Sequence, residues 1–171
     1  MKFLHIGLPK TGTTYLQKKI FPKIAEIKNI LYYEKKDSLK KAIDEHVEKI
    51  YCGDEIKKIS LPDKIIISNE NLICDFPSFS RLEEYAEKNL IAFGKDCKIL
   101  ITIRNPIEYL SSVCNQALKS HIVSPENFFL EDKVYFKNYK NIHFQINRYN
   151  IYKIYDLYKK KFNEVNILKF E

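Results

Sequence analysis

The segment from Gly7 to Thr14, Gly-Leu-Pro-Lys-Thr-Gly-Thr-Thr, has the composition of a loop that binds phosphate. Where such a loop opens a helix, backbone N–H groups point at the anion and the helix dipole adds positive potential. Gly7 and Gly12 have the spacing of the pattern G-x-x-x-x-G-K-[ST], and Thr14 supplies its final hydroxyl. Thr13 stands where that pattern needs lysine, and Lys10 lies inside the loop instead. This departure argues against an ordinary nucleoside-triphosphate hydrolase or kinase.

A second group of residues able to bind phosphate begins with Arg104, which ends a predicted strand. Asn105 and Pro106 follow it directly, and Ser112 stands eight positions after the arginine. A guanidinium can bind two phosphate oxygens at once. Ser112 lies about two helical turns further along, where its hydroxyl adds a donor to a phosphate lying against that side of the helix. The alternative interpretation is structural: a strand followed by an Asn-capped helix, with an arginine on the surface that binds no ligand.

Taken together, the two segments resemble the nucleotide-binding motifs of sulfotransferases that use 3′-phosphoadenosine 5′-phosphosulfate (PAPS). Residues Pro9-Lys10-Thr11-Gly12-Thr13-Thr14 fit the 5′-phosphosulfate loop of that family, approximately P-K-[ST/A]-G-T-T, at every position. Arg104-Asn105-Pro106 with Ser112 fits its 3′-phosphate motif, and the two motifs stand in the family's order. Since ATP has no 3′-phosphate, the second motif favours PAPS over ATP.

The resemblance implies a role for each of these positions. Lys10 would stabilise charge on the bridging and leaving oxygen. The residues expected to hold the 5′-phosphate are Pro9, Lys10, Thr11, Gly12, Thr13 and Thr14, and those expected to hold the 3′-phosphate are Arg104 and Ser112. The family needs no metal, and we expect none here. The family also implies a C-terminal lid over the nucleotide, of which this sequence matches only the beginning.

The reaction also needs a base that takes the proton from the acceptor hydroxyl. Glu70 follows the predicted strand Lys64–Ser68 within Ser-Asn-Glu-Asn, which resembles the S-x-E stretch of bacterial carbohydrate-type members. A positioned base supplies about 10²–10⁴-fold in rate. We therefore predict Glu70 as the base and a hydroxyl, most readily of a sugar or glycan, as the acceptor. A helix-capping or solvated acid is the alternative for Glu70, and His5 is predicted to be a buried core residue.

The elements that must position these residues alternate between strands and helices. Strands are predicted at Lys2–Gly7, Asn29–Tyr33, Lys64–Ser68, Lys98–Arg104 and Val165–Phe170. Runs of consecutive isoleucine suit strands covered on both faces, as in a parallel sheet. We therefore predict an α/β domain with three αβα layers and a mainly parallel central sheet, like that of P-loop nucleoside triphosphatases. Ligands of such sheets bind beyond the carboxyl ends of the strands, where both motifs lie.

The helices are predicted from apolar periodicity and from their start signals. The expected helices begin at Thr13 (kinked or ended by Pro22), at a Ser38 cap, at Arg81 after a Ser80–Glu83 capping box, at Pro106 after an Asn105 cap, and near Ser124, with a last helix over His143–Phe162.

Composition is compatible with one domain over residues 1–171. Apolar residues make up 45% of the 171 residues, enough for one sizeable core. The 29 Lys and Arg exceed the 22 Asp and Glu and give a net charge of +7, which favours an anionic partner or reflects a lysine-rich surface. On charge alone that partner could be nucleic acid, a phosphate-bearing cofactor or an acidic glycan, and most of the lysines are spread along helical stretches. With the two motifs, we expect a nucleotide donor and no nucleic acid. The oligomeric state stays open.

The cysteines and the N-terminus indicate the compartment. None of the four cysteines has a partner at C-x-x-C spacing, and scattered single cysteines are typical of a reducing compartment. The apolar run Phe3–Leu8 is too short for a signal peptide or a membrane span. We therefore predict a cytoplasmic protein without a membrane span.

Two other functions remain open. One is a P-loop-type kinase with a displaced lysine, which would need an acid for Mg²⁺ at the end of another strand and leaves Arg104-Asn105-Pro106 unexplained. The other is a non-catalytic module that binds a nucleotide or an anionic glycan.

Overall fold

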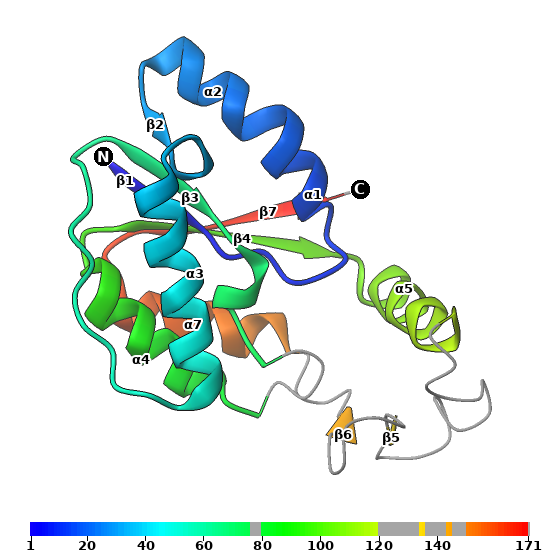
Figure 1. Ribbon diagram of the computed structural model, residues 1–171. Helices are drawn as coiled ribbons and strands as arrows, with labels where there is room; N and C mark the ends of the chain where they lie inside the picture. Colours follow the sequence, from blue (N-terminus) through cyan, green and yellow to red (C-terminus); the bar gives the residue numbers. More distant parts are fainter. Residues whose placement is uncertain (76–79, 120–133, 136–142, 145–149, 171) are drawn as a thin grey trace.

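The computed structural model describes residues 1–75, 80–119, 134–135, 143–144 and 150–170. Its centre is a sheet of five parallel strands in the order β2-β3-β1-β4-β7 (Figure 1). The strands are β1 (Lys2–His5), β2 (Leu31–Tyr32), β3 (Ile65–Ser68), β4 (Lys98–Arg104) and β7 (Val165–Phe170). The predicted α/β class with a parallel central sheet is confirmed.

Helices cover both faces of this sheet and complete three layers (Figure 1). One face carries the helical segment of α1 (Thr13–Tyr15), a π-helical turn (Leu16–Ile20) and α2 (Phe21–Lys28). The opposite face carries α3 (Asp37–Cys52), α4 (Leu82–Phe93) and α7 (Ile151–Lys161). Beyond the carboxyl end of β4 the chain continues into α5 (Pro106–Lys119), which leads away from the sheet (Figure 1). A separate antiparallel pair is formed by β5 (Val134–Tyr135) and β6 (His143–Phe144).

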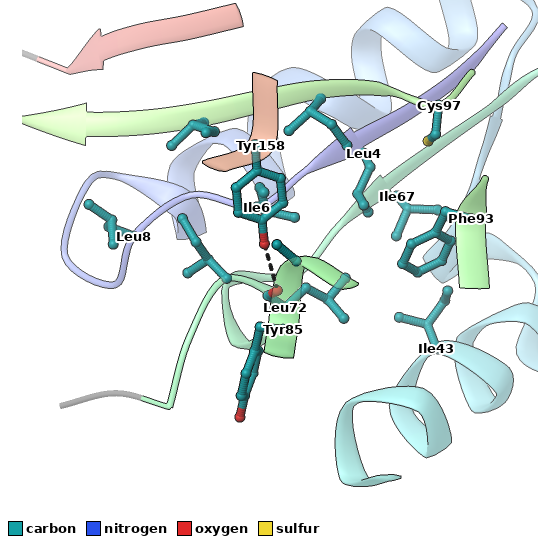
Figure 2. Close-up of a cluster of buried hydrophobic side chains, with 14 of the residues drawn as sticks. Leu4, Ile6, Leu8, Ile43, Ile67, Leu72, Tyr85, Phe93, Cys97 and Tyr158 are labelled. Carbon is teal, nitrogen blue, oxygen red and sulfur yellow. Dashed lines mark hydrogen bonds between the residues drawn. The ribbon is translucent and has the colours of Figure 1, made fainter. Parts of the chain in front are cut away.

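The alternation of side chains along β1 divides the sheet into two different faces. Leu4 and Ile6 point toward the layer of α3, α4 and α7, where they pack in an apolar cluster (Figure 2). On the other face, the rings of Phe3 and His5 lie 6.2 and 5.0 Å from the ring of Phe21 in α2. Because side chains alternate along a strand, β1 places a polar residue, His5, on the α2 face and apolar residues on the opposite face.

The few polar groups within the apolar layer are hydrogen-bonded. Oδ1 of Asn89 in α4 accepts a hydrogen bond from Nε2 of His46 in α3 at 3.2 Å, and Nδ2 of Asn89 donates to the Leu72 carbonyl at 2.6 Å. The Tyr158 hydroxyl of α7 reaches the same carbonyl at 3.4 Å (Figure 2). Buried polar groups without partners are costly, so this network fixes how the three helices pack on one another.

Several predicted boundaries agree with the structure. The strands Lys98–Arg104 and Val165–Phe170 are confirmed at both ends. The Asn105 cap is also confirmed, because its Oδ1 accepts a hydrogen bond from the Ile107 N–H at 3.0 Å. Local signals were sufficient here: an apolar run that ends in Arg-Asn-Pro specifies both the end of the strand and the start of the helix.

Other predicted boundaries are wrong. β1 ends at His5 rather than Gly7, and β2 spans Leu31–Tyr32 only. Ser38 lies inside α3, which begins at Asp37. Ser80 does not cap α4, because its hydroxyl donates to Asp75 at 2.5 Å instead.

The first and the last of the helix predictions also need correction. The predicted helix over His143–Phe162 is shorter: His143–Phe144 is a strand, and α7 begins after Asn150, whose side chain accepts from the Lys153 N–H at 3.2 Å. Pro22 does not end its helix. It lies in the first turn of α2, directly after the π-helical turn, where its missing N–H is tolerated. The helix predicted near Ser124 lies outside the described residues.

Two further observations concern the whole fold. All four cysteines are free, and three of them, Cys74, Cys97 and Cys114, are buried. Among the helices in the described part of the chain, none combines the length and apolarity needed to cross a membrane.

Candidate functional site

The loop that follows β1 lies against the carboxyl-terminal half of β4. The Ile6 N–H donates to the Leu100 carbonyl at 3.0 Å, and the Leu8 N–H donates to the Thr102 carbonyl at 3.2 Å. The chain therefore continues alongside β4 after β1 ends and reaches the carboxyl edge of the sheet before it turns into α1. This arrangement fixes the entry to the loop by backbone hydrogen bonds.

The turn at Lys10 has an uncommon backbone conformation. Lys10 has a φ of 68° and is exposed, whereas its neighbours Pro9 and Thr11 are buried. The Thr11 hydroxyl closes the turn by donating to the Leu8 carbonyl at 2.6 Å. A left-handed conformation costs a residue with a Cβ about 1–2 kcal/mol. The neighbouring contacts hold Lys10 at the outermost point of the loop despite this cost.

Both glycines of the loop stand where a side chain would collide. Gly12 has a φ of 76°, and a Cβ there would lie 2.5 Å from the ring of Phe170 in β7. A Cβ on Gly7 would lie 1.8 Å from the Thr102 hydroxyl and 2.8 Å from the imidazole of His5. The spacing of these glycines, recognised in the sequence, thus reflects close packing of the loop on β1, β4 and β7.

Glu70 is brought to the start of the helical segment that follows the loop. It begins a short 3₁₀ helix, Glu70–Leu72, directly after β3, and Asn69 caps this turn by accepting from the Asn71 N–H at 3.0 Å. The buried hydroxyl of Thr13 donates a hydrogen bond to Oε2 of Glu70. The sequence predicted Glu70 as a functional acid but did not predict this contact, which requires β3 to be the neighbour of β1.

Arg104 lies on the same face of β4 as Thr102, because the two residues are two positions apart in one strand. Thr102 contacts the loop through Thr11, with 2.9 Å between the two hydroxyl oxygens. The Arg104 side chain is 32% exposed, and its Nε donates to Oε2 of Glu108 at 2.9 Å. Sequence reasoning missed Glu108 as a partner, although its distance of four positions from the arginine was visible.

Ser112 lies one helical turn after Glu108 in α5 and is half-buried. Residues four positions apart in a helix lie on the same side, so Glu108 and Ser112 share one side of α5. The side of α5 that carries Ser112 is therefore the side reached by the guanidinium of Arg104. The structure thus brings these residues of the second motif into one row.

A buried polar cluster under the loop was not predicted. His5 is fully buried, and its ring nitrogens lie 2.7 Å from the Ser68 hydroxyl and 3.0 Å from the Thr102 hydroxyl. Burial lowers the pKa of His5 to about 4, so its imidazole is neutral at pH 7. The prediction that His5 is a hydrogen-bonded core residue is confirmed. A signal for Thr102 exists in the sequence, because it is the one hydroxyl residue within a strand of isoleucine and leucine.

Of the other three histidines, the structure describes the side chain of His46. His46 is buried in the helix layer and bonded to Asn89. His121 and the side chain of His143 lie outside the described part of the chain. Among the residues that the structure describes, no group of three or more His, Cys, Asp or Glu side chains is arranged to hold a metal ion.

The carboxyl edge of the sheet therefore carries a lysine-bearing turn, a helix start, a carboxylate hydrogen-bonded to that helix start, and an arginine on the same sheet face. Positive groups and free backbone N–H groups can bind an anion, and a carboxylate next to them can accept a proton. Neither protein-family models nor curated proteins give any match to this chain, so its interpretation depends on these residues and their geometry.

Proposed function

We propose that this chain is the nucleotide-binding domain of a sulfotransferase, which moves a sulfuryl group from PAPS to an acceptor hydroxyl. The observation that carries the proposal is the hydrogen bond between Thr11 and Thr102, 2.9 Å between oxygens. It joins the loop of the first motif to the strand that ends in Arg104, the first residue of the second motif. The loop of the first motif thus contacts β4 two residues before the second motif begins, and a nucleotide with phosphates at both ends would need the two motifs on the same side of the sheet.

In the proposed reaction the acceptor oxygen forms a bond to sulfur while the bond from sulfur to the 5′-phosphate oxygen breaks. The leaving product is 3′-phosphoadenosine 5′-phosphate. Lys10 stabilises the charge that develops on the leaving oxygen, and the loop residues from Thr11 to Thr14 hold the 5′-phosphate. Glu70 accepts the proton of the acceptor hydroxyl. Its contact with Thr13 supports this role, because it orients the carboxylate beside the loop.

Arg104 and Ser112 bind the 3′-phosphate in this proposal. Their alignment with Glu108 on one side of α5 supports it, since a phosphate bound there would lie between a guanidinium and a hydroxyl. The acceptor is a hydroxyl of a carbohydrate, because the Glu70 segment resembles that of carbohydrate-type members.

Calorimetric titration tests the proposal directly. We expect 3′-phosphoadenosine 5′-phosphate to bind without metal, more tightly than ATP with Mg²⁺, and Arg104→Ala to weaken this binding. Lys98→Ala is the matched control, because this substitution also removes one positive charge, but from the opposite end of β4. There the Lys98 ammonium pairs with the Glu164 carboxylate at 2.6 Å. Equal loss in both variants would mean that only net charge matters, and no binding by the wild-type chain would contradict the proposal.

A P-loop-type kinase with a displaced lysine is the second candidate, and one observation favours it. The Glu70 carboxylate beside the loop stands where such an enzyme would need an acid for Mg²⁺. Preference for ATP with Mg²⁺ in the same titration would support the kinase. A non-catalytic binding module predicts tight nucleotide binding and no turnover with any acceptor.

A further inference from the structure

A line of buried hydrogen bonds runs beneath the loop from β3 through β1 to β4. It begins at the Ser68 hydroxyl, 2.7 Å from Nδ1 of His5, whose Nε2 lies 3.0 Å from the Thr102 hydroxyl. It continues over 2.9 Å to the Thr11 hydroxyl and ends over 2.6 Å at the Leu8 carbonyl. All four side chains are completely inaccessible to solvent. The line therefore connects the end of β3 to the turn that carries Lys10.

The end of this line determines the position of every proton in it. The Leu8 carbonyl can only accept, so the single proton of Thr11 is directed there. Thr11 must then accept from Thr102, whose own proton is used in turn. Thr102 consequently accepts from His5, which requires the N–H of the neutral imidazole to be on Nε2. Nδ1 is left as an acceptor, and the Ser68 hydroxyl donates to it.

Gly7 is a second, independent sign that this line is built into the fold. A Cβ at Gly7 would lie 1.8 Å from the Thr102 oxygen and 2.8 Å from Nε2 of His5. The missing side chain of Gly7 thus leaves the space through which the hydrogen bond between His5 and Thr102 passes. Replacing either partner or the glycine disturbs the same point.

We propose that His5 is a positioning residue for the loop: it donates the hydrogen bond that the line Ser68–His5–Thr102–Thr11–Leu8 requires at Thr102, and so holds Lys10 in its left-handed conformation. This inference rests on the proposed function in one respect, since the loop is taken to bind the nucleotide. His5 does not reach the ligand, because it is buried under the loop. It acts through Thr102 and Thr11, whose hydroxyl closes the turn around Lys10.

The first test reads the imidazole directly. Nitrogen-15 NMR of the labelled wild-type chain at pH 7 distinguishes the two neutral tautomers and the charged ring. We expect His5 as the neutral tautomer with its proton on Nε2. A proton on Nδ1 alone makes Nε2 an acceptor from Thr102 and would overturn the proposal, and so would a charged ring, which cannot accept from Ser68. This readout needs no nucleotide.

The second test separates the hydroxyl of Thr102 from its volume. Thr102→Val keeps the shape but removes the hydroxyl, whereas Thr102→Ser keeps the hydroxyl. We expect Thr102→Val to weaken binding of 3′-phosphoadenosine 5′-phosphate by about tenfold and to shift the amide resonances of Lys10 and Gly12. Thr102→Ser should bind within about twofold of wild type and leave these resonances in place.

The outcomes distinguish this inference from the proposed function. If Thr102→Val and Thr102→Ser give the same loop resonances as wild type, the line does not position the loop and the inference is wrong. If the wild-type chain binds no 3′-phosphorylated nucleotide, the proposed function fails. The loop resonances and the tautomer of His5 then still show whether the hydrogen-bonded line positions the loop. Ser68→Ala, at the far end, provides a check: it should shift the His5 nitrogen resonances.

Discussion

The hydroxyl of Thr13 donates a hydrogen bond to the carboxylate of Glu70, although the two residues are 57 positions apart in the sequence. Thr13 is the first residue of α1, and Glu70 begins the short 3₁₀ helix that follows β3. The contact depends on β3 and β1 being neighbours in the sheet. It is the contact that supports the proposal of Glu70 as the base.

Glu70→Gln is expected to reduce turnover strongly and to retain nucleotide binding. The glutamine keeps an oxygen that accepts from Thr13, so the start of α1 stays in place, but the amide cannot take a proton. We expect the turnover number to fall by about 10²–10⁴-fold while the affinity for 3′-phosphoadenosine 5′-phosphate changes little. Glu26→Gln, on the exposed side of α2, is the control. Parallel loss of binding and turnover in Glu70→Gln would make Glu70 a structural residue.

Two substitutions of Lys10 separate its charge from its backbone. Lys10→Ala and Lys10→Gly both remove the ammonium group and should lose turnover to the same extent. Because φ is 68° at this position, glycine avoids a cost that alanine bears. We expect the free energy of unfolding of Lys10→Gly to exceed that of Lys10→Ala by about 1 kcal/mol, measured by urea denaturation. Equal stability of the two variants would contradict the left-handed turn.

Gly12→Ala is expected to be more destabilising than Gly53→Ala. The two glycines have similar backbone angles, with φ of 76° and 85°, so the conformational cost of a Cβ is alike. At Gly12 the added carbon would also lie 2.5 Å from the ring of Phe170, whereas at Gly53 the nearest atom is 3.8 Å away. Overpacking costs about 1–3 kcal/mol, and this difference should appear in the free energies of unfolding. A second substitution, Phe170→Leu, should recover part of the loss only in Gly12→Ala.

Glu108→Gln is expected to strengthen binding of the 3′-phosphorylated nucleotide. The carboxylate of Glu108 pairs with Arg104 at 2.9 Å, so it competes with a bound phosphate and repels it. We expect a several-fold gain in affinity with a stability change below about 1 kcal/mol, as is usual for exposed ion pairs. The control is Glu45→Gln, which breaks the exposed pair of Lys41 with Glu45, 3.9 Å apart. Weaker binding by Glu108→Gln would instead mean that Glu108 orients the arginine.

Stability should fall as the pH is lowered from about 6.5 toward 4. Burial lowers the pKa of His5 from 6.5 to about 4 and also lowers the pKa of His46. Between these values the unfolded chain binds more protons than the folded chain, so protonation favours unfolding. For His5 the difference corresponds to roughly 3 kcal/mol. The slope of the unfolding free energy against pH measures how many more protons the unfolded chain binds, and His5→Gln should lower this number by about one. An unchanged slope would contradict a neutral buried His5.

The sequence was sufficient for the elements whose signals are local. The isoleucine-rich run before Arg104 and the Asn105-Pro106 pair define β4 and the start of α5 correctly. The spacing of Gly7 and Gly12 located the loop, since close packing there excludes every side chain.

The missed contacts of Thr13 and Thr102 depend on distant segments of the chain coming together. Whether Thr13 would meet Glu70, or Thr102 would meet His5, depends on the order of strands in the sheet, which periodicity does not encode. The helix predicted from His143 failed for a related reason. Aromatic residues at helical spacing also suit a strand, and the Asn150 cap decides where α7 begins.

The contact of Phe170 with Gly12 has a consequence for how the protein is made. A ribosome synthesises the loop early, but the ring that packs on Gly12 belongs to β7, which is synthesised after every other described element. Contacts between such distant segments form slowly, because a long loop of chain must first be closed. The nascent chain therefore carries a loop that lacks its packing partner until β7 joins β4.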